Sequence, residues 1–152
     1  MMNILVVVED NRGSMHRMSK EAIAGAQKIG GNITALVIGA NADAIADQLS
    51  SIALENTLVV KHELVSSYNS DGYTEVVKQV IQSINPSIII IGHTYQTRDF
   101  MPRVSARLDI PFIPDIIGLE QDAYTKQVLN SKLNSSVSSL SDMKILSFQS
   151  AC

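Results

Sequence analysis

The strongest constraint on the fold is a regular alternation between short runs that are apolar throughout and longer segments with helical periodicity. Residues 4–8 and 88–91 are apolar on both alternating faces, which is typical of strands that helices cover above and below. Two further apolar runs and three amphipathic segments complete the pattern: 33–38 and 57–60, and 18–29, 42–54 and 76–84. Strands that alternate with helices of this length predict parallel pairing through right-handed crossovers.

The expected architecture is therefore a three-layer α/β/α domain with a mainly parallel sheet. A chain of 152 residues has the length of one domain, which we place at residues 1–152. The last third has a different pattern, because residues 123–129, 132–137 and 143–148 are strand-like and are separated by Ser, Asn and Asp turns. Antiparallel strands are common at the edge of mixed sheets, so we expect these three strands to form a β-rich extension there.

A basic helical segment lies between these two parts. Residues 99–108 predict a helix with Pro102 in its first turn, where the missing amide hydrogen costs little. Arg103 and Arg107 lie one turn apart on a common edge of this helix, where they can meet acids or a partner.

Composition and charge exclude several classes of protein. A formal net charge of −3 offers no basic surface for nucleic acid. No apolar run approaches the roughly 20 residues that cross a bilayer, so we expect no membrane insertion. The N-terminus lacks the pattern of a secretion signal, and the single cysteine, Cys152, cannot form an internal disulfide. A reducing, intracellular compartment fits this composition.

The sequence predicts no catalytic or metal site. Parallel sheets bind ligands at the carboxyl ends of their strands, but the loops at residues 9–14 and 92–97 contain one glycine each, too few for a phosphate-binding loop. His62 and His93 both follow strands and can share one rim, yet no third ligand lies at a metal-binding spacing. No serine lies in a nucleophile elbow. We therefore expect a cleft filled by side chains.

The order of motifs along the chain is distinctive. A valine-rich first strand ends in Glu9, a helix over residues 19–31 closes in Lys-x-Gly-Gly, and the second strand ends in Gly39. Later, residues 102–108 read Pro-Arg-Val-Ser-Ala-Arg-Leu and residues 114–116 read Pro-Asp-Ile. This order resembles the N-terminal domain of electron transfer flavoprotein alpha subunits, where a Pro-Arg-Val-Ala-Ala-type helix, a leucine and a Ser-Asp-Val/Ile-type turn follow one another.

The resemblance covers nearly the whole chain and implies an adenine nucleotide alpha hydrolase-like α/β fold within a heterodimeric electron carrier, not an enzyme. It implies a beta-like subunit as partner. It also implies that FAD rests mainly on a separate, FAD-binding C-terminal domain of the alpha subunit and is not bound by this domain alone. The implied compartment is the bacterial cytoplasm or the mitochondrial matrix. The residues expected to dock the partner or that second domain are Arg98, Pro102, Arg103, Arg107 and Asp115.

The chain departs from the family pattern in two places. Thr97 stands where a glycine commonly precedes the Pro-Arg helix. Residues 131–135 keep only the asparagine of an aromatic-Ala-Gly-Asn-Ala segment, and a neutral residue near Gln127 or Val128 replaces an arginine. Less backbone freedom and less charge weaken a close approach to a cofactor or a partner domain.

Two other functions are compatible with the same fold. One is a small adenine-nucleotide-binding module, with residues 8–14 and 92–97 around the adenosine. The other is a hydrolase of the same superfold, which has only fold-level support.

Overall fold

The computed structural model describes residues 2–120, 123–128, 133–137 and 143–149, with side chains described for residues 2–117 and 143–149. Within these residues one sheet contains eight strands, in the order β5-β4-β1-β6-β10-β7-β8-β9. Their bounds are β1 (Asn3–Val8), β4 (Asn32–Ile38), β5 (Asn56–Val60), β6 (Ile88–Gly92), β7 (Phe112–Glu120), β8 (Ala123–Val128), β9 (Leu133–Val137) and β10 (Lys144–Phe148). From β5 through β4, β1, β6 and β10 to β7, neighbouring strands pair in parallel. Strand β8 pairs antiparallel with β7, and β9 pairs antiparallel with β8. The predicted three-layer α/β/α fold is therefore confirmed.

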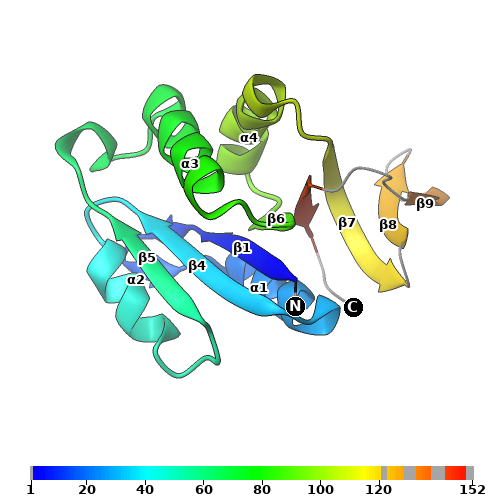
Figure 1. The fold of residues 1–152 in the computed structure, drawn as a ribbon, viewed down its shortest axis with the longest axis horizontal. Coiled ribbons are helices and arrows are strands. Elements are labelled where there is room, and N and C mark those ends of the chain that lie inside the picture. The colour runs from blue at the N-terminus through cyan, green and yellow to red at the C-terminus, as the bar shows by residue number, and fades with distance from the viewer. Residues whose placement is uncertain (1, 121–122, 129–132, 138–142, 150–152) are drawn as a thin grey trace.

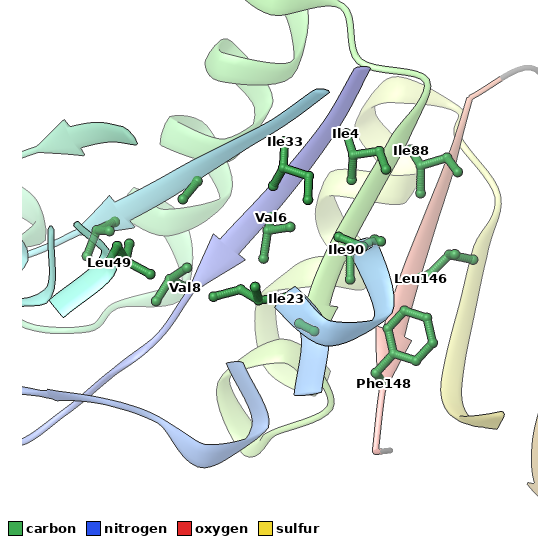
Figure 2. Close-up of a cluster of buried hydrophobic side chains, with 14 of the residues drawn as sticks. Ile4, Val6, Val8, Ile23, Ile33, Leu49, Ile88, Ile90, Leu146 and Phe148 are labelled. Carbon is green, nitrogen blue, oxygen red and sulfur yellow. The ribbon is translucent and has the colours of Figure 1, made fainter. Parts of the chain in front are cut away.

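Helices cover both faces of the parallel part of the sheet (Figure 1). The helices are α1 (Arg17–Ile29), α2 (Ala42–Leu49), α3 (Ser70–Ile84) and α4 (Tyr95–Leu108), with a short 3-10 helix η1 (Glu63–Val65) before α3. Alternate residues of β1 point to opposite layers: Val6 packs with the α1 and α2 side chains, whereas Leu5 packs with those of α3 and α4. Figure 2 shows the first of these two cores. Burial on both faces explains why the strands are apolar throughout.

The strand at residues 144–148 lies in the middle of the sheet, not at its edge. Strand β10 pairs in parallel with β6 on one side and β7 on the other. The expectation of an antiparallel edge strand was therefore wrong for this segment. The physical reason is burial: Ile145, Leu146 and Phe148 are fully buried and contribute to both cores, which requires helices on each face. Strands β8 and β9 do form the predicted antiparallel extension.

Helix α4 begins earlier than the sequence predicts. Thr94 caps it, because the Thr94 hydroxyl accepts a hydrogen bond from the Thr97 amide at 3.2 Å. Pro102 therefore lies inside the helix, as an exposed residue, and not in its first turn. Thr97, Phe100 and Val104 are buried on one face that extends through the proline, so packing holds the segment helical across it.

Two other helix ends also differ from the predictions. Helix α2 ends at Leu49, although the periodic pattern continues to residue 54. Helix α3 begins at Ser70, before the amphipathic segment that the sequence predicts at residues 76–84, because the Asn69 side chain accepts a hydrogen bond from the Gly72 amide at 2.7 Å. Among the described residues, no helix has the length and hydropathy that a membrane span requires.

Candidate functional site

The strand order changes direction between β1 and β6. The chain passes from β1 through α1 to β4 and then β5 on one side, and it returns through α3 to β6 on the other side. The carboxyl end of β1 leads into Glu9, and that of β6 leads into His93 and Thr94. Ligands bind open parallel sheets at such a reversal, so this edge is where a site is expected.

Glu9 joins three elements at this edge. Its carboxylate accepts a 2.6 Å hydrogen bond from the Thr94 hydroxyl, at the start of α4. Its second oxygen lies 3.8 Å from the His16 ring, and His16 is the N-cap residue of α1. The Glu9 side chain is only 12% exposed, and this burial raises its pKa, with the Thr94 hydrogen bond and His16 acting in the opposite direction. The Glu9 carboxylate therefore links β1 to the first turns of two helices.

The single glycine of the second loop serves packing. A Cβ on Gly92 would lie 2.7 Å from the Met18 backbone, so only glycine lets α1 approach β6 this closely. Thr97, at the position where the family commonly has glycine, is fully buried, and its hydroxyl donates to the Gly92 carbonyl at 2.5 Å. The Thr97 side chain is thus bonded to the backbone where β6 ends.

The first loop is a small hairpin. Strands β2 (Asp10–Asn11) and β3 (Ser14–Met15) pair across a turn in which Gly13 has a positive φ of 89°. The Asp10 carboxylate accepts hydrogen bonds from the Gly13 amide at 2.6 Å and from the Asn41 side chain at 2.9 Å. The Gly13 amide is thereby used in the turn instead of facing a ligand.

The described residues at this edge do not fit a flavin or its phosphates. A phosphate would have to approach the start of α4, where Glu9 already places a carboxylate bonded to Thr94. Like charges repel most strongly where water is excluded. The close contact of Gly92 with Met18 packs α1 directly against β6.

A second polar cluster follows from the central position of β10. The Ser147 hydroxyl is fully buried and lies 2.9 Å from Nδ1 of His93. It also accepts a hydrogen bond from the Asp115 amide at 3.0 Å, where the backbone has a left-handed φ of 59°. Sequence analysis missed this cluster, because it depends on β10 lying between β6 and β7. Asp115 meets Ser147 through its amide and not its carboxylate, so this is not the geometry of a nucleophilic triad.

The histidines do not converge. His62 and His93 both lie at the carboxyl edge, but β4 and β1 separate their strands, a spacing of roughly 14 Å. Nδ1 of His62 accepts from the Leu64 amide, and Nδ1 of His16 accepts from the Met18 amide. Within the part of the chain that the structure describes, no three His, Cys, Asp or Glu side chains are grouped to hold a metal ion.

The residues predicted to dock a partner lie in four different settings. Arg103 donates to Asp71 of α3 at 2.7 Å, and Arg107 lies 3.9 Å from Glu75 of α3, so both link two neighbouring helices. Arg98 instead lies over the ring of Tyr95, with the guanidinium carbon 4.6 Å from the ring centroid. Pro102 is exposed between them, and Asp115 belongs to the Ser147 cluster. The α3 carboxylates neutralise much of the basic edge that the sequence indicates.

The departures at residues 127–135 concern side chains that lie outside the described part, and residues 131 and 132 lie wholly outside it. The backbones of β8 and of β9 are described and are paired with each other.

Comparison with known proteins identifies relatives along most of the chain. The chain is 32% identical over 116 residues to an electron transfer flavoprotein subunit alpha of Bacillus subtilis, a match that covers 75% of the chain and 36% of the relative. It is 28% identical to the same subunit of Clostridium acetobutylicum over 85% of the chain and 40% of the relative. It is 27% identical to a probable mitochondrial alpha subunit of Caenorhabditis elegans over 95% of the chain and 44% of the relative.

The chain therefore spans about two fifths of the length of the curated relatives it matches. The family model described as the electron transfer flavoprotein domain matches residues 4–152, almost the whole chain. On this match, the chain belongs to the electron transfer flavoprotein family, and its relatives named here are alpha subunits.

Proposed function

We propose that this chain acts as the N-terminal, non-catalytic domain of an electron transfer flavoprotein alpha-like subunit. In this role it docks a beta-like subunit and frames a flavin that a separate domain holds. The partner surface includes the exposed part of α4 around Arg98 and Pro102. The bacterial cytoplasm or the mitochondrial matrix is the compartment that fits this role.

The observation that carries the proposal is the extent of the match to alpha subunits. It includes 75–95% of this chain but only 36–44% of each relative named above, as expected for one domain of a larger subunit. The geometry of the switch point agrees with a scaffold role. Glu9 and Thr94 are bonded to each other there, and Gly92 is needed for packing against α1.

The test is to purify the chain alone and together with the beta subunit of an electron transfer flavoprotein from the same organism. We expect the chain alone to be colourless and to form a 1:1 complex with the beta subunit in sedimentation velocity. Tight, stoichiometric FAD on the isolated chain, or no complex at micromolar concentrations, would contradict the proposal.

Calorimetry with AMP and ATP distinguishes the adenine-nucleotide-binding alternative. A scaffold domain gives no heat of binding. Micromolar affinity for either nucleotide would favour the alternative, and its loss in Thr94→Ala would place that nucleotide at the switch point.

A further inference from the structure

Strand β5 forms one edge of the sheet, and among the described residues no strand pairs with its outer side (Figure 1). The Val60 carbonyl accepts a hydrogen bond from the Gly39 amide at 3.0 Å, so the carbonyl of Val60 faces β4. Backbone groups alternate between the two sides of a strand, and those of Thr57 and Val59 therefore face outward. The outer side of β5 thus offers amides and carbonyls to a further strand.

Strand β5 lacks the usual features that prevent an edge strand from pairing. Natural edge strands commonly carry a charge, a proline or a bulge. Residues 56–60 read Asn-Thr-Leu-Val-Val, without charge or proline. Their register with β4 is regular over the whole strand, whereas the pairing of β7 is irregular with both of its neighbours. The edge formed by β5 is therefore regular enough to extend the sheet.

The residues of β5 are complementary to a second copy of the same strand. Two copies related by a twofold axis present the same surface to each other, and at this edge they can pair antiparallel. An axis beside Leu58 places Thr57 opposite Val59 of the second copy. These are the residues whose backbone groups face outward, so they form the hydrogen-bonded pairs, and Leu58 lies beside its own copy in a non-hydrogen-bonded pair.

Opposite charges at the two ends of β5 favour this register. Glu55 precedes the strand and Lys61 follows it, so the same twofold axis places each Glu55 opposite Lys61 of the second copy. Glu55 forms no ion pair within the described residues, and Lys61 pairs with the exposed Asp43. The Glu55 amide bonds the Ile33 carbonyl at 2.8 Å, so the contact at each end is between side chains. A parallel, in-register pairing would bring like charges together.

We propose that two copies of this chain associate through β5, antiparallel about Leu58, so that their sheets become continuous. Backbone hydrogen bonds between Thr57 and Val59 join the two strands, and the Glu55–Lys61 pairs select the antiparallel register. This inference goes beyond the proposed docking function and does not depend on it. The partner is identified by charge complementarity, since the edge matches its own reversed sequence.

Sedimentation velocity on the full chain, from micromolar to millimolar concentrations, measures the association. Val59→Lys introduces a charge into the middle of the junction, twice in each dimer, and we expect it to raise Kd by about 10-fold or more. The Val59 side chain is 37% exposed, so the fold should tolerate the lysine. Tyr95→Lys is the matched control, because it places a lysine at an exposed position of α4, away from β5, and should leave Kd within about 2-fold of the wild type.

A charge exchange tests the register. Glu55→Lys and Lys61→Glu each bring like charges together at both ends of the junction, and each should raise Kd by about 3-fold or more. The double variant Glu55→Lys/Lys61→Glu restores opposite charges between the copies, so it should bind more tightly than either single variant. Only pairing of the chain with itself predicts this rescue. Circular dichroism on each variant separates loss of association from loss of folding.

Three results would overturn the inference. The wild type could stay monomeric at millimolar concentration, or its dimer could be insensitive to Val59→Lys. Growth into species larger than a dimer would indicate a head-to-tail contact between unlike edges instead of a twofold one. If the wild type stays monomeric and Val59→Lys weakens its complex with the beta subunit, β5 pairs with that subunit, and the docking function stands while the self-association is wrong.

Discussion

Replacing Gly92 by alanine tests whether this glycine is present for packing. The added Cβ would lie 2.7 Å from backbone and side-chain atoms of Met18, and at least one element must move by roughly 0.7 Å to restore ordinary contact. Because the contact is with backbone at the interface of β6 and α1, a flexible side chain cannot relieve it. Overpacking of this kind costs about 1–3 kcal/mol, and we expect the upper end of that range.

The expected loss is directly measurable. For a chain of about this length, 1 kcal/mol lowers Tm by about 2–4 °C, so Gly92→Ala should melt about 6–12 °C below the wild type. Gly13→Ala is the matched control, because a Cβ there meets no atom within 4 Å and only the positive φ of 89° is strained. That variant should lose about 1 kcal/mol. Equal melting temperatures for the two variants, by circular dichroism and urea unfolding, would refute the packing explanation.

Two further predictions concern the polar groups at the carboxyl edge. Burial raises the pKa of Glu9 in the folded state, so its ionisation costs stability as pH rises from the unfolded pKa through the folded one. Glu9→Gln should therefore gain stability relative to the wild type as pH rises, and a difference in unfolding free energy that stays constant from about pH 4 to 8 would contradict this. Ser147→Ala removes the acceptor of the Asp115 amide and the partner of His93 in a buried site, and it should cost about 1–3 kcal/mol in urea unfolding. Ser50→Ala, at an exposed position, should change stability by less than about 0.5 kcal/mol, and an equal loss in both variants would remove the special role of Ser147.

Sequence patterns predict the fold class because burial on two faces leaves a local signature. A strand between two helical layers must be apolar at every position, and residues 4–8 and 88–91 show this without any knowledge of their neighbours. Helix boundaries were predicted less well, since they depend on caps and on packing. Thr94 begins α4 one turn before the periodic apolar pattern indicates, and Pro102 remains helical because its neighbours are buried.

Only part of the candidate site was predictable from the sequence. The loops after β1 and β6 were predicted to meet at one edge, because any parallel sheet brings the carboxyl ends of its strands together. The contact between Ser147, His93 and Asp115 was not predictable, since these residues belong to segments far apart in the chain whose order in the sheet has no local signal. The pairing of Arg103 and Arg107 with α3 was also hidden, because a helical wheel does not specify which neighbour a face meets.

The sequence by itself therefore determined the alternation of elements, the layered architecture and the family, because these depend on residue type and short-range spacing. Only the tertiary structure decided that β10 enters the sheet between β6 and β7, that side chains close the switch point, and that Arg98 is the α4 arginine without a carboxylate partner among the described residues. Those outcomes depend on contacts between distant segments, whose energies are set by burial and geometry and not by local composition.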